Sequence, residues 1–235
     1  MTQTLFVTTV VASCLVMAPS QPPQATEVAV PVRVSAVELS AVDPTISFNL
    51  ENTGAKAITA WEVFVSVGDR TTGRSVDAYR GLAGLTQPGS HILPGGTLSV
   101  TLPLPFRLTS SSVKPIVTVT GAIFEDKSSV GNAKWIDLVF QSRAGELAAW
   151  TEVVAELEKL RAAPILGAGA VEEATALFDV APRNDGGDSI RKVTRTNLGL
   201  VTGDLSIGQA KAFSRLDLLL KLARDSRAAA AAHTL

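Results

Sequence analysis

The chain has little cysteine and little histidine, and its charges nearly cancel. It contains one cysteine, Cys14, and two histidines, His91 and His233, in 235 residues. A single cysteine excludes an intrachain disulfide and a cysteine-based zinc site. The shortage of histidine argues against histidine-dependent catalysis, and the formal net charge of −1 gives no basic excess for nucleic acid. We therefore predict no enzyme, no cofactor, no metal site and no nucleic-acid partner.

The N-terminus carries an apolar run, Leu5–Ala18, followed by the proline-containing stretch Pro19–Gln24. At about 14 residues the run is shorter than the roughly 20 that a membrane-spanning helix needs, but it suits the core of a signal peptide. Small residues are spaced for cleavage before Gln21. We predict a signal peptide and linker over residues 1–25.

Cys14 leaves an alternative open. Val11–Cys14 has the form of a lipobox, in which lipid attached to the cysteine would tether the protein. In both cases the expected location is outside the cytoplasm, in the periplasm or associated with the cell envelope. The membrane would be contacted only through the signal segment or through the lipid on Cys14.

Two runs of alternating apolar residues lie between Pro44 and Val67. The side chains on one face of each run are Ile46, Phe48 and Leu50 in the first, and Trp61, Val63, Val65 and Val67 in the second. Asn52-Thr53-Gly54 between the runs is a turn sequence. A side-chain period of two around such a turn predicts an antiparallel hairpin with one buried face.

Further alternating segments predict more strands. They are Val28–Leu39, Arg74–Tyr79 after a turn at Thr71–Gly73, Leu98–Leu104 after a turn at Leu93–Gly96, and Val117–Phe124. Pro103 and Pro105 suit an edge strand or its end, whereas Val117–Phe124 is apolar on both faces and is predicted to be central. Gly81–Ser90 is predicted to be a loop. The spacing is typical of a small Greek-key β-sandwich over residues 26–131.

Four motifs in this β-rich segment occur together. They are Asn52-Thr53-Gly54 with Lys56, the Val-x-Val run after it, the turn at Leu93–Gly96 and the late central strand. In this combination the chain resembles the Ig-like FxLyD-type modules of exported bacterial envelope proteins over Thr26–Ala144. Val67-Gly68-Asp69 stands where the naming motif carries Leu-Tyr-Asp. The resemblance implies an Ig-like sandwich and no common activity.

From Asn132 the apolar period becomes helical. Asn132 is the predicted N-cap, and apolar residues continue at helical spacing to about Ala162, before Pro164. A helix of about 30 residues is about 45 Å long, so its second half extends beyond a small sandwich and needs another partner. Two more helices are predicted, one over Ala170–Phe178 and a last one opened by a capping box, Ser206-x-x-Gln209. Residues 132–235 thus form a helical region.

The two long predicted helices share an apolar seam with 3-4-3 spacing. Its residues are Leu147, Trp150, Val154 and Leu157 in the first helix, and Phe213, Leu216, Leu220 and Ala223 in the last. Trp135–Asp179 has eight acidic and three basic residues, net −5, whereas Pro182–Leu235 has nine basic and five acidic, net +4. We predict an antiparallel helical hairpin within the chain. The alternative is pairing of the same seams in a homodimer.

Several residue groups suggest a binding site, and each has a simpler explanation. Glu125-Asp126 near Ser128 and Ser129, and the loop Asn184–Asp188, lack the Asp-x-Asp-x-Asp pattern of a calcium loop and are predicted to be solvated turns. Gly167–Ala170 lacks the Gly-Lys-Ser/Thr ending of a phosphate loop and is predicted to be a joint. His91 is predicted to be a surface loop residue. None is predicted to be catalytic, to bind a cofactor or to hold a metal.

The tryptophans and a cluster of basic residues are likewise predicted to have structural rather than binding roles. Trp61 is predicted to be core, and Trp135 and Trp150 are predicted to pack against the sandwich or the partner helix rather than stack on a sugar. The basic residues Arg183, Arg191, Lys192 and Arg195 are predicted to face water or the acidic helix.

The predicted function is a non-enzymatic binding or assembly module of a bacterial cell envelope, whose partner is an unknown envelope or secreted protein. Two alternatives stay open: an accessory or inhibitor protein acting on an exported enzyme, and a hydrolase that uses only carboxylates. The hydrolase would need two carboxylates facing one pocket about 5 to 10 Å apart.

Overall fold

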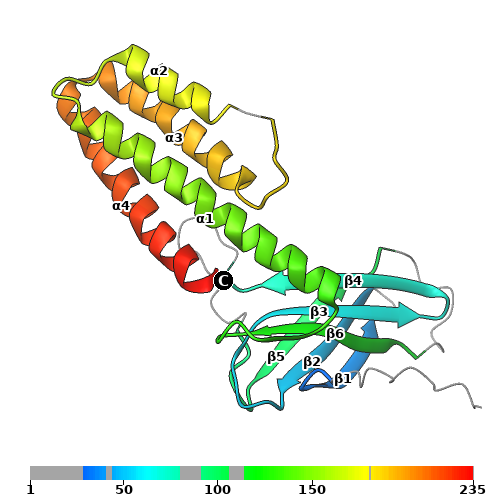
Figure 1. Ribbon diagram of the computed structural model, residues 1–235. Helices are drawn as coiled ribbons and strands as arrows, with labels where there is room; N and C mark the ends of the chain where they lie inside the picture. The colour runs from blue at the N-terminus through cyan, green and yellow to red at the C-terminus, as the bar shows by residue number, and fades with distance from the viewer. Residues whose placement is uncertain (1–28, 41–43, 80–90, 106–113, 180, 235) are drawn as a thin grey trace, which may run out of the picture.

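The computed structural model describes residues 29–40, 44–79, 91–105, 114–179 and 181–234. In these residues the chain forms seven strands and four helices (Figure 1). The strands are β1 (Val32–Ser40), β2 (Thr45–Asn52), β3 (Ile58–Val67), β4 (Arg70–Asp77), β5 (Thr97–Pro103), β6 (Ile116–Phe124) and β7 (Ser129–Gly131). The helices are α1 (Ala133–Ala162), α2 (Ala168–Leu177), α3 (Asp188–Leu205) and α4 (Gln209–His233). The predicted signal segment with Cys14, and the predicted loop Gly81–Ser90, lie outside the described residues.

The strands form two antiparallel sheets, ordered β1-β2-β5 and β4-β3-β6-β7. Residues from both sheets contribute to one apolar core, so the sheets pack face to face. The helices follow the strands in sequence and extend away from the sheets (Figure 1). The prediction of an α+β chain with an antiparallel β part and a helical C-terminal part is confirmed at this level.

The two alternating runs around Asn52 form strands, but the predicted hairpin is wrong. The inward side chains of β2 and β3 are buried as expected. However, β2 pairs with β1 and β5, whereas β3 pairs with β4 and β6. The two runs therefore approach one core from opposite sheets. A period of two identifies the buried face of a strand, but it does not identify the strand beside it.

Asn52 organises the segment that crosses between the sheets. Its buried side chain donates hydrogen bonds to the carbonyl oxygens of Lys56 and Ile92, both at 2.8 Å, and accepts one from the Gly54 N–H at 2.9 Å. The Asn-Thr-Gly sequence is thus a turn in a crossover connection. Since Ile92 lies shortly before β5, the same amide also joins the crossover to the next described segment.

The predicted turn at Thr71–Gly73 is also wrong, because these residues belong to β4. The turn lies at Gly68–Asp69, where Gly68 has a φ of +65°. Gly73 has a packing role instead, since a Cβ there would lie 2.9 Å from Cε1 of Phe64 across the β3–β4 pair. The other strand predictions are confirmed: β5 is an edge strand, and β6 lies between β3 and β7, although β7 covers only its second half.

Helix α1 joins the β part to the helical part. Its predicted cap is present, because Asn132 Oδ1 accepts a hydrogen bond from the Trp135 N–H at 3.3 Å. The first turns pack on the outer face of the β3–β6 pair, where Trp135 contacts Ala60 and Ile123. The later turns lie in the core of the helical part. The expectation that the second half needs another partner is confirmed.

The four helices share a second apolar core, to which each contributes buried residues. The sequence prediction missed α3, whose buried positions include Ile190, Leu198 and Val201. The predicted capping box is wrong, because the Ser206 hydroxyl donates back to the Gly203 carbonyl oxygen at 2.7 Å and closes α3. The N-cap of α4 is Gly208, which has no side chain to cap the helix.

Helices α1 and α4 pair antiparallel within the chain, as predicted. Arg161 near the end of α1 contacts Asp217 near the start of α4 at 2.5 Å, and Glu158 contacts Arg224 at 2.7 Å. At the other end, Arg143 Nη1 donates to the His233 carbonyl oxygen at 3.5 Å. The C-terminal end of α4 thereby returns to the sheets (Figure 1).

Candidate binding groove

An open groove lies between the first strand of one sheet and the last strands of the other. It has a volume of about 1060 Å³ and is walled by the start of β1, the first half of β6 and β7. Six valines from these strands line it: Val30, Val32, Val34, Val117, Val119 and Val130. All six are partly buried and pack against the β core. At this side of the molecule the core is therefore only partly covered by the described residues.

Both walls of the groove are strand edges. β1 is the outer strand of its sheet and pairs only with β2 among the described strands. β7 is short and pairs with Gly121–Ile123 of β6. In the described part of the chain, no strand pairs with the same side of Ile116–Val119. Thr120 is already engaged on that side, because its carbonyl oxygen accepts a hydrogen bond from the Asn132 N–H at 2.7 Å. Such edges present backbone N–H and C=O groups that can pair with another strand.

The groove lining carries no charged side chain, and its polar groups are partly engaged by the protein itself. Thr120 Oγ1 and Asn132 Nδ2 both donate to Glu62 Oε2, at 2.7 and 2.9 Å. The groove surface is thus mixed, with valine side chains beside hydroxyl, amide and backbone polar groups. None of its described lining residues is an acid or a base.

A second cluster forms where α4 meets the sheets, and it brings together both histidines. The rings of Tyr79 and His233 stack with an interplanar angle of 9°, and His91 meets the Tyr79 ring edge-on at 4.9 Å. Arg143 of α1 lies over the Tyr79 ring and binds Asp77 through Nε and Nη2, at 2.9 and 2.8 Å. His91 is exposed, as predicted for a loop residue.

Burial governs the ionisation of this cluster. It raises the pKa of Tyr79, and Arg143 only partly offsets that effect. Burial also lowers the pKa of His233, and the positive charge of Arg143 adds to the effect. Both rings are therefore neutral near pH 7. Among the described residues no histidine is joined by hydrogen bonds to a nucleophile and a carboxylate, so the cluster does not form a catalytic triad.

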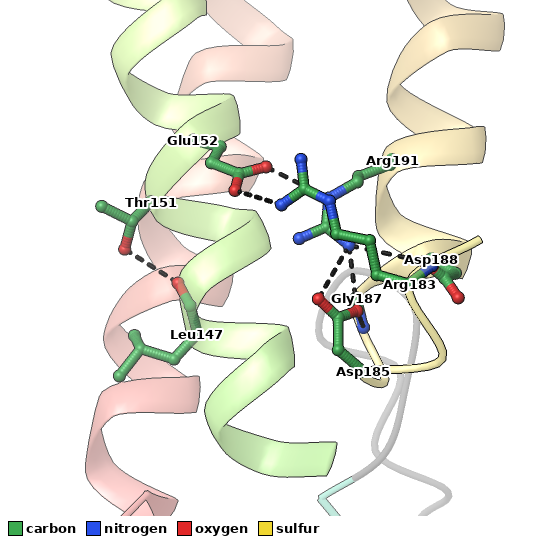
Figure 2. Close-up of polar contacts among 8 residues, drawn as sticks. All are labelled: Leu147, Thr151, Glu152, Arg183, Asp185, Gly187, Asp188 and Arg191. Atoms are coloured by element: carbon green, nitrogen blue, oxygen red, sulfur yellow. Dashed lines mark hydrogen bonds and ion pairs between the residues drawn. The ribbon is translucent and has the colours of Figure 1, made fainter. Parts of the chain in front are cut away.

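The loop predicted to be a solvated turn at Asn184–Asp188 is part of an ion-pair network around Arg191 (Figure 2). Arg191, only 2% exposed, binds Glu152 of α1 at 3.1 Å and Asp185 at 2.9 Å, and Arg183 also binds Glu152, at 2.9 Å. The loop packs closely on α1, because a Cβ at Gly145 would lie 1.5 Å from the Asp185 carbonyl oxygen.

These contacts set the ionisation of the network. Desolvation raises the pKa of Glu152, but hydrogen bonds from Arg191 and Arg183 outweigh it and the net shift is downward. The hydrogen bond from Arg191 lowers the pKa of Asp185. The prediction that the basic residues face water or the acidic helix is confirmed, since Arg183 and Arg191 reach α1, whereas Lys192 and Arg195 are exposed to water.

One cavity does hold two carboxylates. Asp179 and Asp188 both line a cavity of about 290 Å³ beside α3. Asp179 is bound by Arg195 at 2.7 Å, and Asp188 lies 3.5 Å from Arg191. Glycoside hydrolysis needs one carboxyl of the pair to donate a proton. A carboxylate held in an ion pair with arginine does not suit that role, so this pair does not make the hydrolase alternative stronger.

The remaining candidate residues have structural roles. Asp126 binds Lys56 at 2.5 Å and accepts a hydrogen bond from Ser128, and the Lys56 hydrogen bond is the main reason that the pKa of Asp126 falls to about 2. The predicted joint at Gly167–Ala170 is wrong, because Gly167 is the N-cap of α2 and residues 168–170 form its first turn. Trp61, Trp135 and Trp150 are all buried in apolar clusters, as predicted.

The important residues that sequence reasoning missed are Glu62, Asp77, Tyr79 and Arg143. For Arg143 a signal was present. It lies three residues after Phe140 and four before Leu147, so it occupies a position on the apolar seam of α1. A charged residue at such a position indicates a buried ion pair. Nothing in the spacing of Asp77 or Tyr79 indicates that they meet α1.

No protein-family model matches the chain, and a search of curated proteins finds no match. Two further observations concern the described residues alone. None of their helices is both long and apolar enough to cross a membrane. They contain no group of three or more histidine, cysteine, aspartate or glutamate side chains that could hold a metal ion.

Proposed function

We propose that this protein is an exported, non-enzymatic binding or assembly module of a bacterial cell envelope, with an Ig-like sandwich of the FxLyD type as its scaffold. One observation carries the proposal: the β core opens into an uncharged groove bounded by two strand edges. An open strand edge beside partly buried valines supports the proposal, because another extended chain can pair with such an edge. Its partner would be another envelope or secreted protein.

The helical part serves this function as a rigid extension. α1 is continuous from the outer face of the β3–β6 pair to the core of the helical part. The buried Arg143–Asp77 ion pair fixes the two parts at their junction, with both side chains less than a tenth exposed. A partner held in the groove would therefore have a defined position relative to the helices. Because the apolar seams of α1 and α4 are buried against each other within the chain, a homodimer would have to use the outer faces of these helices.

The test is site-specific photo-crosslinking in cells that naturally make the protein. p-Benzoylphenylalanine in place of Val34, which lines the groove, is compared with the same residue in place of Val37, which lies in the same strand outside the groove. We expect a discrete adduct from position 34 alone, identified by mass spectrometry, in the envelope fraction. Equal adducts from both positions, or recovery of the protein in the cytosol with Met1 retained, would refute the proposal.

A further inference from the structure

We infer that the groove binds an extended peptide segment of a partner protein, which adds as a strand beside Ile116–Val119 of β6. The inference rests on the proposed function and specifies its ligand. The geometry favours a strand because β7, the fourth strand in the order β4-β3-β6-β7, covers only part of the length of β6. β7 lies next to Gly121–Ile123 and ends there. An added segment would continue the line of β7 along the first half of β6.

The backbone of the groove walls supports an extended ligand. An edge strand offers N–H and C=O groups on its open side, and another extended backbone pairs with them repeatedly. β1 across the groove is also an edge strand, and its second half is irregular, with a bulge between Ser35 and Glu38. Bulges of this kind discourage strand pairing. The regular part of β1, which lines the groove, has no such protection.

The side chains of the walls specify the chemistry of the ligand. Val117 and Val119 are two residues apart, as are Val32 and Val34 on the opposite wall. An extended ligand repeats its side chains with the same period of two, so it would place every second residue between these valines. The lining is uncharged, and the inward residues of the ligand should therefore be apolar and neutral. Proline is excluded where a backbone N–H must pair with β6.

The probe is a synthetic peptide, acetyl-Lys-Val-Thr-Val-Thr-Val-Lys-amide with a fluorescent label. At about 3.3 Å per residue, the five central residues of this peptide are long enough to cover the open edge, and the terminal lysines extend beyond it. We expect saturable binding to the full chain in fluorescence anisotropy. The register of β6 against β3 shifts at Thr120, which interrupts the alternation of β6. Before it, β3 binds the backbone of Ile116 and Thr118, since the residues opposite them are those that β3 turns away from β4. The open side therefore carries the amides of Val117 and Val119, and hydrogen exchange at these two amides should slow at least tenfold. Absence of binding, or binding without protection of these amides, would overturn the inference.

Two controls separate strand addition from adhesion to an apolar surface. A peptide with the same side chains but N-methylated at alternate residues cannot donate those backbone hydrogen bonds, and it should bind at least tenfold more weakly. Val119→Lys puts a charge into the groove and should also weaken binding at least tenfold. Val37→Lys, outside the groove, should leave it unchanged. If the N-methylated peptide binds as tightly as the parent, strand addition is refuted. That conclusion does not depend on how any variant folds.

Other occupants give distinct results. If the amides of Val117 and Val119 are already protected in the full chain and removal of residues 1–28 abolishes the protection, the occupant is the chain's own N-terminal segment and the inference is wrong. If sedimentation shows a dimer that Val119→Lys dissociates, the occupant is a second copy and the inference is again wrong. A position-34 adduct combined with failure of the peptide refutes the strand but leaves the proposed function standing.

Discussion

The Arg143–Asp77 ion pair should be one of the most sensitive points of the structure. The side chains are 4% and 8% exposed, and the guanidinium makes two hydrogen bonds of 2.9 and 2.8 Å to the carboxylate. Replacing Arg143 by Met leaves the Asp77 carboxylate buried without its partner. Removing one member of a buried pair costs about 3–5 kcal/mol, so we expect Arg143→Met to lower the free energy of unfolding by that amount.

The surface pair Arg161–Asp217 is the matched control. Its side chains are 44% and 54% exposed, and it joins α1 to α4 at the far end of the helices. An exposed pair contributes about 0–1 kcal/mol, so Arg161→Met should have a small effect although it removes the same side chain. Urea unfolding followed by tryptophan fluorescence measures both variants.

A double-mutant cycle then isolates the interaction itself. Asp77→Asn alone should also destabilise the protein, because it leaves the Arg143 charge buried without a carboxylate. The double variant has neither charge and should lose much less than the sum of the single losses. The reasoning is refuted if Arg143→Met costs no more than Arg161→Met, or if the losses from Asp77→Asn and Arg143→Met simply add.

Three further predictions concern other contacts. Gly121→Val places a Cβ 2.7 Å from Cε3 of Trp135. It should lower the free energy of unfolding by about 1–3 kcal/mol and shift the maximum of tryptophan fluorescence. An unchanged spectrum would argue against this contact. Arg191→Met should lower the free energy of unfolding, measured in urea, by about 1–3 kcal/mol, a moderate loss because the acidic partners of Arg191 stay partly hydrated. An unchanged free energy of unfolding would contradict the network. Burial lowers the pKa of His233 from 6.5, so the unfolded chain binds more protons. The free energy of unfolding should therefore decline as the pH falls below about 6.5, and it should decline less steeply in His233→Phe. Equal slopes of unfolding free energy against pH in the two proteins would refute this.

The side-chain pattern of the strands was predictable, whereas their pairing was not. Phe48 and Val63 both face the core, as their alternation indicates. The alternation is the same whether two successive strands lie side by side or in opposite sheets. The choice depends on contacts of Asn52 with Ile92, which is 40 residues away in sequence. Local periodicity carries no information about such a contact.

The helical part shows the same division. Asn132 was predictable as an N-cap because capping involves residues within one turn. Helix α3 was missed although Ile190, Thr194, Leu198 and Val201 repeat at helical spacing, because polar and charged residues dominate the segment and one of these four buried positions is a threonine. Gly73 and Ser206 misled the prediction, since a residue type that is common in turns and caps also serves close packing and helix ends.

The amino-acid sequence by itself determined which side chains face a core, where α1 begins and that opposite charges would hold α1 and α4 together. These properties depend on backbone geometry over a few residues, or on composition. The tertiary structure alone decided that β1 lies opposite β6 and that β7 ends after three residues. It also decided that Tyr79, Arg143 and His233 meet. The groove and the junction exist only because distant segments pack together, and distance along a chain does not specify distance in space.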